Sequence, residues 1–289
     1  MSVSIWFETF NNNLRMSDET VKTIAYRYRR MTKQLNKDFW TTDSEIAHSW
    51  YVGSYGRDTD IHVSDIDMIF QLPYSVYEKY NAYTNNGQSA LLQVVKASVE
   101  TTYPSSLKAD GQVIVVNFTD GIRFEIVPAF LNTSGTFTYP DSNNGGSWKV
   151  TNPKPEISEI RDKNILWNNN LKRLARMARA WKDNWNVPMG GLLIDTLAYN
   201  FMGNWGHRDR SFLYYDYMSR DFFKFLAEQS EQQYWLSPGG RQYVWRTGNF
   251  SYKAKQCYNI ALEAIDKETK FPTTAKVKWR DIYGTKFPS

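Results

Sequence analysis

Residues 51–72 read YVGSYGRDTDIHVSDIDMIFQL, and they join a Gly-Ser turn to a segment in which polar and apolar residues alternate. Successive side chains on a β-strand point to opposite faces, so Asp65 and Asp67 are predicted to share one face of a strand. The opposite face is apolar and would anchor this strand in a core: Ile66, Met68 and Phe70. Two carboxylates this close repel each other unless a cation lies between them.

The turn and the two carboxylates together indicate chemistry on a phosphate compound. Paired carboxylates with room for water and phosphate oxygens are the ligands that Mg²⁺ prefers. The turn, Gly53 and Ser54, supplies backbone N–H groups that can hold a phosphate. Our first hypothesis is therefore metal-assisted nucleotide chemistry, which we favour over the alternative that Asp65 and Asp67 are two solvated strand residues.

Composition limits the class of protein. The 289 residues suffice for one large domain or two closely joined lobes, and 11 Trp, 19 Tyr and 16 Phe can fill a sizeable core. No apolar run approaches the roughly 20 residues of a membrane span, and the first ten residues lack the layout of a signal peptide, so we expect a soluble cytoplasmic protein. The single Cys257 excludes an internal disulfide, and the three histidines, His48, His62 and His207, show no zinc-ligand spacing. Any metal is therefore expected to be bound by oxygen.

The net charge of +5 comes from 35 Lys and Arg against 30 Asp and Glu, and it is mild. Nucleic-acid binders usually carry dense basic patches, whereas a pocket for a triphosphate needs only a few well-placed cations. The charge balance favours a small ligand over a polynucleotide.

The sequence before and after the opening stretch predicts further elements of an α/β lobe. A helix is expected to begin at Ser17 or Asp18, with its apolar positions recurring every three or four residues: Val21, Ile24, Tyr28, Met31 and Leu35. A second packing helix is expected over 89–100. Residues 113–118 and 122–127 flank an Asp-Gly pair and predict a hairpin, which Pro128 is expected to end. Glu125 on its second strand is a third strand carboxylate that could join the other two.

The second half of the chain predicts mainly helices. Residues 132–147 are expected to form a surface loop or a small hairpin, and 148–155 to cross between lobes. A helix over 171–185 has an apolar stripe and a basic remainder. That basic part is either an ordinary solvated face or, at Lys182, a cation that reaches a triphosphate. Further helices are expected over 192–202, 221–226 and 252–265, and a packed C-terminal tail after them.

The residues quoted so far carry a family likeness. Gly53-Ser54, then ten residues, then Asp65-Ile66-Asp67 and a distant strand carboxylate resemble the polymerase-β-like nucleotidyltransferase superfamily. The chain is further similar to the bacterial CD-NTases, of the SMODS type, which are cyclic-oligonucleotide synthases related to cyclic GMP-AMP synthase and to oligoadenylate synthases. The blocks that carry this second resemblance are GSYGRDTDIHVSDIDMIF (53–70), FEIVPAF (124–130), WKVTNP (148–153), RMARAWKDNW (176–185) and KVKWRDIYGTKFP (276–288).

The resemblance implies an α+β fold. A catalytic lobe with a twisted mixed sheet would occupy 1–155 and a helical lobe 156–289, with the N-terminal helix packing across both and the active site in the cleft between them. It implies two Mg²⁺ ions, replaceable by Mn²⁺, held by Asp65, Asp67 and Glu125. It also implies that Gly53 and Ser54 hold the donor phosphates, and it matches Lys182 to the family's phosphate-binding lysine.

Three departures from the family pattern stand out. The third acid is commonly Asp, whereas this chain has Glu125, whose extra methylene can reshape the site. Gly190 and Gly191 stand where many relatives carry a Ser, so one hydroxyl contact to phosphate is missing or moved. The zinc insertion of the animal enzyme is absent, which argues against DNA sensing by that route.

The implied activity is the synthesis of a cyclic di- or trinucleotide from ATP, GTP or pyrimidine triphosphates, with release of pyrophosphate. In this family the product would activate a separate effector in bacterial anti-phage (CBASS) signalling, and regulatory protein partners are conceivable, but neither a nucleic acid nor a membrane is required. Two alternatives remain open. One is template-independent nucleotide addition to a linear oligonucleotide or RNA, and the other is a nucleotide-binding module whose catalytic site has decayed.

Overall fold

The computed structural model describes residues 2–61, 65–104 and 107–289. His62, one of the three histidines without zinc-ligand spacing, lies outside the described residues. The chain divides into two compact units, which we call the sheet unit (Met16–Gly56 and His62–Lys154) and the helical unit (Met1–Arg15, Arg57–Ile61 and Pro155–Ser289). Where we predicted one cut between 155 and 156, the helical unit also takes in two segments from the first 61 residues.

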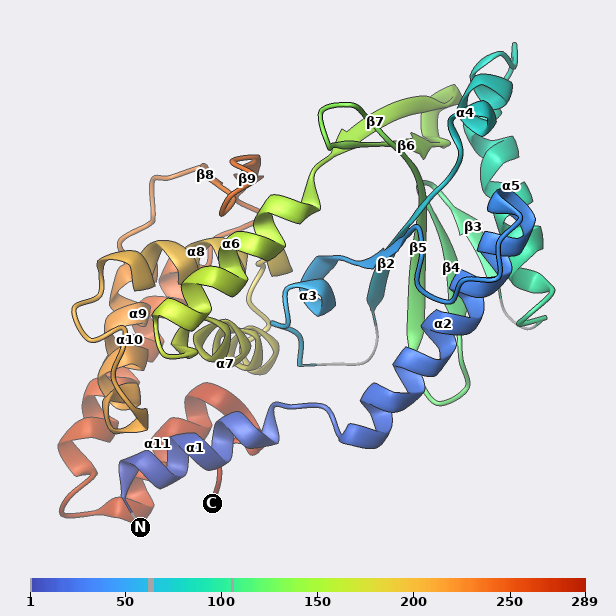
Figure 1. Ribbon diagram of the computed structural model, residues 1–289. Coiled ribbons are helices and arrows are strands. Elements are labelled where there is room, and N and C mark those ends of the chain that lie inside the picture. The colour runs from blue at the N-terminus through green and yellow to red at the C-terminus, as the bar shows by residue number, and fades with distance from the viewer. Residues whose placement is uncertain (1, 62–64, 105–106) are drawn as a thin grey trace. The chain divides into compact units, whose positions relative to one another are not determined.

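The sheet unit is built on seven described strands in the order β1-β2-β5-β4-β3, with β6 and β7 continuing from the end of β5 (Figure 1). β2 and β5 run parallel, and the other described pairs are antiparallel, so the sheet is mixed, as predicted. The strands are β1 (Ser49–Tyr51), β2 (Ile66–Gln71), β3 (Leu107–Asp110), β4 (Val113–Asn117), β5 (Arg123–Leu131), β6 (Phe137–Asp141) and β7 (Ser147–Thr151).

Helices cover the apolar face of this sheet. The predicted first helix is α2 (Asp18–Trp40), which Ser17 caps by accepting a hydrogen bond from the Thr20 N–H at 3.1 Å. The second predicted helix is α5 (Gly87–Glu100), and two shorter helices, α3 (Gly53–Gly56) and α4 (Tyr74–Asn81), complete the unit. The inward side chains of α2 and α5 share one buried cluster with the strands, including Ile24, Met31, Leu91, Val95, Ile66, Met68, Phe70, Phe124 and Ile126. The anchoring face of the Asp65/Asp67 strand is therefore confirmed.

The helical unit contains the four helices predicted over 171–185, 192–202, 221–226 and 252–265, and others that we did not predict, among them Pro153–Leu166 and Pro272–Tyr283. The helices are α1 (Val3–Asn13), α6 (Pro153–Leu166), α7 (Asn170–Asn184), α8 (Gly191–Asn204), α9 (Tyr215–Ala227), α10 (Ser251–Lys267) and α11 (Pro272–Tyr283), with a small hairpin of β8 (Tyr234–Leu236) and β9 (Tyr243–Trp245). Phe7 of α1 is fully buried against Trp279 and Phe287 of the C-terminal tail, with ring centroids 5.1 and 5.2 Å apart. The tail is packed, as predicted, and no helix in the described ranges is both long and apolar enough to cross a membrane.

The hairpin of β4 and β5 ends before Pro128, as expected, since its last pair joins Ile114 to Ile126. β5 itself continues to Leu131, because the missing proline N–H falls where no described partner strand needs it. The Ala129 carbonyl accepts from the Leu72 N–H on the β2 side. Because neighbouring residues of a strand point their backbone groups to opposite sides, the Pro128 nitrogen faces the β4 side. There the last pair with β4 is at Ile126, so no N–H is needed at Pro128. One expectation about local structure was wrong: the basic residues of α7 are not all solvated, since Arg176 and Arg179 are 5% and 7% exposed.

Candidate functional site

Two of the three predicted carboxylates lie directly opposite each other. Asp67 on β2 is paired with Glu125 on β5 in the parallel register, so both side chains leave the sheet on the same face. Asp65 lies immediately before β2 in the chain, two residues before Asp67. The other face is closed by the buried core, because Ile66 and Met68 are 0% exposed. The strand pair thus presents its acids on the face that is not covered by α2 and α5.

The Gly-Ser turn lies against Asp67. The Val52 N–H donates to the Asp67 carbonyl at 2.9 Å, and Tyr51 of β1 pairs with Met68, which fixes the start of α3 beside β2. Gly53 has a φ of +61°, and a Cβ built on it would come within 1.9 Å of Asp67 Oδ2. The Asp67 carboxylate therefore occupies the space that any other residue at position 53 would need.

A cation from the chain itself lies among these carboxylates. Arg123 stands two residues before Glu125 on β5 and shares its face. Its guanidinium donates to Glu125 and lies 3.9 Å, from Nε to Oδ1, from Asp65. Arg123 Nε is buried and has no hydrogen-bond partner among the residues that the structure describes. The strand spacing placed Arg123 on the face of Glu125, but sequence reasoning did not assign Arg123 to the site.

The donor set fits Mg²⁺ by its chemistry, since it offers hard carboxylate oxygens from neighbouring strands beside a small-residue turn. Within the described ranges, no three His, Cys, Asp or Glu side chains are already arranged to hold a metal. The contacts of Arg123 give a physical reason: its guanidinium takes up carboxylate oxygens that a metal would need.

Lys182 belongs to the other unit. It lies in the last turn of α7, is 38% exposed at its side chain, and pairs with the neighbouring Asp183 at 3.2 Å. Gly190 caps the start of α8 and Gly191 is its first residue. A Cβ at Gly190 would meet nothing within 4 Å, and one at Gly191 only Arg179 Nη2 at 3.4 Å. Space for a larger residue thus exists at both positions.

A buried charge cluster anchors the segment that follows the Gly-Ser turn. Asp195 of α8, 1% exposed, accepts from Arg57 Nε at 2.8 Å and from Thr59 Oγ1 at 3.0 Å. Arg179 of α7 donates to both oxygens of Asp195, at 2.6 and 2.9 Å. Burial alone would raise the pKa of Asp195, but Arg179 and Arg57 together hold it below its usual value.

Asp58, which follows Arg57 in the chain and is half exposed, pairs with Arg176 at 2.9 Å and with Lys172 at 3.3 Å. Arg57 is therefore tied to α8, and Asp58 to α7, by ion pairs. We did not predict this cluster. One signal for it was available, because Asp195 is the lone charged residue in the largely apolar run LLIDTLAY, and a buried acid needs a cationic partner.

A mixed sheet that carries acids on two parallel strands beside a Gly-Ser turn, followed by a helical unit, is a nucleotidyltransferase fold. The chain belongs to the Second Messenger Oligonucleotide or Dinucleotide Synthetase (SMODS) domain family, whose model matches residues 1–164. The family resemblance drawn from the motifs is thereby confirmed.

Known proteins agree with this assignment. A curated relative from Bacillus cereus (strain VD146), named as a probable cyclic nucleotide synthase, is 24% identical over 183 residues. The match covers 57% of this chain and 52% of that protein, so the chain spans about half the length of the curated relative it matches.

Solved structures extend the likeness to nearly the whole chain. The Bradyrhizobium diazoefficiens CD-NTase CdnG, solved with GTP, has a TM-score of 0.69 at 9% identity and covers 98% of this chain and 95% of its own. The Vibrio cholerae cyclic AMP-GMP synthase DncV, solved with a linear pppA(3′,5′)pG intermediate, has a TM-score of 0.66 at 14% identity, covering 99% and 87%. At these identities the likeness establishes the fold.

Proposed function

We propose that this protein is a metal-dependent nucleotidyltransferase that joins nucleoside triphosphates into a cyclic di- or trinucleotide and releases pyrophosphate. The observation that carries the proposal is the register of β2 and β5, which sets Asp67 opposite Glu125, with Gly53 packed against the Asp67 carboxylate. Family membership and the nucleotides named with the structures of CdnG and DncV support the same conclusion.

The proposed reaction consists of two similar transfers. The ribose hydroxyl of one nucleotide attacks the α-phosphorus of another, a new P–O ester bond forms, and the bond from that phosphorus to the β-phosphate oxygen breaks. Pyrophosphate leaves with the electron pair, and the hydroxyl proton is released to solvent. The linear intermediate then turns in the site, and a second transfer of the same kind closes the ring and releases a second pyrophosphate.

Asp65, Asp67 and Glu125 would hold two Mg²⁺ ions, or Mn²⁺ in their place. Bound there, the metal would lower the pKa of the attacking hydroxyl and offset the charge of the donor triphosphate. Arg123 would have to give up its contacts with Glu125 and Asp65 at that point. Its guanidinium would stay on the face of the sheet that carries the acids, where it would donate hydrogen bonds to the donor phosphates instead.

The N–H groups of the turn at Gly53 and Ser54 would hold the donor phosphates, which Gly53 allows because it has no side chain to push Asp67 aside. Lys182, exposed near the end of α7, would add a further cation for these phosphates. Many relatives carry a Ser here whose hydroxyl contacts phosphate. Gly190 and Gly191 have no side chain to make that contact, and the space beside them is open.

The biological role that goes with this activity is anti-phage signalling in the bacterial cytoplasm, where nucleoside triphosphates are available. The cyclic product would bind a separate effector, and regulatory proteins could control its synthesis.

One experiment tests the proposal. The purified protein is incubated with four labelled nucleoside triphosphates and Mg²⁺ or Mn²⁺, treated with phosphatase, and the resistant products are identified by mass. A cyclic product that disappears with Asp65→Asn, Asp67→Asn or Glu125→Gln is expected. Asp110→Asn is the matched control, since Asp110 is also a strand carboxylate with a cationic neighbour, Lys108, at 2.8 Å. Only linear products, or a cyclic product unaffected by Asp67→Asn, would refute the cyclase.

A further inference from the structure

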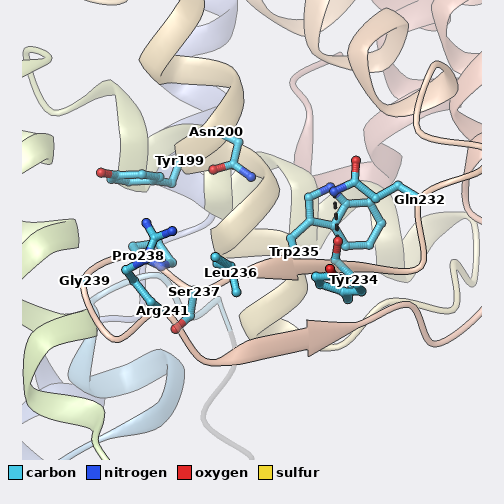
Figure 2. Close-up of a pocket in the computed structure, with 10 residues that line it drawn as sticks. All are labelled: Tyr199, Asn200, Gln232, Tyr234, Trp235, Leu236, Ser237, Pro238, Gly239 and Arg241. Atoms are coloured by element: carbon cyan, nitrogen blue, oxygen red, sulfur yellow. Dashed lines mark hydrogen bonds between the residues drawn. The ribbon is translucent and has the colours of Figure 1, made fainter.

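A pocket of about 390 Å³ lies wholly within the helical unit, between α8 and the β8–β9 hairpin (Figure 2). None of the predicted carboxylates and neither residue of the Gly-Ser turn lines it. Tyr199 and Asn200 of α8 form one side, and Gln232, Tyr234 and the loop that follows β8 form the other. Its volume falls within the range of about 300–1,000 Å³ that is usual for small-molecule sites.

The walls of the pocket are fixed before any ligand arrives. Tyr199 donates from its hydroxyl to Glu159 at 2.6 Å, and burial together with this bond raises the pKa of Tyr199 to about 12, so the phenol stays protonated. On the other side, Gly239 has a φ of +64°, and a Cβ there would come within 2.3 Å of the Pro155 carbonyl. The loop is therefore pressed onto α6 and held in one position.

Aromatic faces and unpaired polar groups meet in this pocket. The Tyr234 ring is 43% exposed and is supported by Tyr243 and Trp245, with ring centroids at 4.9 and 5.4 Å. The guanidinium of Arg241, an exposed residue of the lining, makes no ion pair or hydrogen bond with any residue that the structure describes. The side-chain amide of Asn200 is likewise without a hydrogen bond within the described chain. The nearby Glu159 is already engaged by Tyr199.

These groups call for a ligand with three properties. It must offer a flat ring to the tyrosines, a hydrogen-bonding edge to the Asn200 amide, and an anionic group to Arg241. A nucleoside monophosphate has a stacking base with such an edge, carries a phosphate, and matches the pocket in size. We infer that the helical unit binds a nucleotide in this pocket, at a second site that uses neither the carboxylates nor a metal ion.

Calorimetric titration of the full chain with AMP and with GMP, in EDTA to remove divalent metals, tests this inference. Both are expected to bind one site. Arg241→Gln should weaken AMP binding about fivefold, the effect of losing one charge pair near 4 Å in water, and leave adenosine binding unchanged. Tyr234→Leu should weaken AMP and adenosine alike, because it removes the ring on which the base stacks.

The controls separate this site from the proposed catalytic one. Arg210→Gln removes another exposed arginine of the helical unit and should leave AMP binding unchanged. Asp67→Asn should also leave it unchanged while abolishing any synthesis of cyclic product. The inference is overturned if neither AMP nor GMP binds in EDTA, if Arg241→Gln and Tyr234→Leu both bind AMP as the unaltered chain does, or if Asp67→Asn abolishes AMP binding. None of these results bears on the proposed cyclase activity.

Discussion

Asp67 and Glu125 are direct partners across the one described parallel strand pair, although 57 residues separate them in the chain. This register brings two carboxylates to one face of the sheet. It also decides which neighbours they meet, since Gly53 lies against one and Arg123 against the other. The first two predictions follow from these neighbours.

Gly53→Ala is expected to reduce synthesis of product by roughly 100-fold, the usual effect of moving a reacting group by about 1 Å. The new methyl group would push the Asp67 carboxylate out of place, because it would lie within 1.9 Å of Oδ2. Because the backbone here has a positive φ, alanine should also lower the free energy of unfolding by about 1–3 kcal/mol. Initial rates and urea unfolding measure the two effects.

Gly121→Ala is the matched control, because Gly121 also has a positive φ, of +86°, but nothing lies within 4 Å of its Cβ position. It should lose comparable stability and keep its activity. Equal activity of the two variants would mean that the crowding against Asp67 has no catalytic consequence.

Arg123→Gln is expected to tighten Mn²⁺ binding to the nucleotide-free protein about fivefold. The substitution removes a positive charge that competes with the metal for Glu125 and Asp65, and such a charge is worth about 1 kcal/mol near 4 Å in water. Isothermal titration with Mn²⁺ measures the effect. Lys108→Gln, which removes a strand cation paired with Asp110, should leave Mn²⁺ affinity unchanged. Weaker Mn²⁺ binding by Arg123→Gln would show that Arg123 supports the metal site rather than competing with the metal.

Asp195→Asn is expected to lower the free energy of unfolding by about 3–5 kcal/mol, because it leaves buried Arg179 without its counter-charge and Arg57 with only Glu156, at 3.8 Å. Urea denaturation of the full chain measures this loss. Glu100→Gln breaks an exposed pair with Lys96 and should cost about 0.5 kcal/mol or less. If Asp195→Asn lowered the free energy of unfolding by no more than Glu100→Gln does, the cluster would not anchor this segment.

Glu268→Gln is expected to flatten the pH dependence of stability. Burial and the neighbouring Asp216 raise the pKa of Glu268 to about 8, so the folded chain binds a proton that the unfolded chain releases above its ordinary value of 4.5. Stability should therefore fall as pH rises from about 4.5 to 8.

Glutamine carries no charge to bury and still offers an oxygen to the indole N–H of Trp279, which donates to Glu268 at 3.1 Å. The melting temperature of the variant should exceed that of the unaltered chain at pH 8 and approach it at pH 5. Melting temperatures over this pH range decide the matter. A variant with an unchanged pH slope would show that Glu268 titrates normally.

Several features could be predicted from the sequence because they depend on local pattern. Alternation assigned the Asp65/Asp67 strand and its buried apolar face, and the capping residue Ser17 marked the start of α2. The hairpin that carries Glu125 followed from the residues around Asp120 and Gly121. The family likeness depended on the same local motifs, and for that reason the amino-acid sequence was sufficient to draw it.

Other features depend on which elements meet, and local pattern does not contain that information. Charge alone predicted a solvated face for α7, yet Arg176 and Arg179 are buried. Arg176 meets an acid, Asp58, from a segment more than 100 residues away. The β4–β5 ladder ends before Pro128, as expected, but local pattern does not show that β5 runs on to Leu131 beside β2 and β6.

The sequence by itself determined the strand, the turn, the acids and the family, since each is written in residues that lie close together along the chain. The tertiary structure alone decided that Glu125 stands opposite Asp67, that Arg123 lies among the acids, and that Asp195 holds the segment after the turn. Each of these is a contact between distant parts of the chain, fixed by sheet register or by the pairing of buried charges.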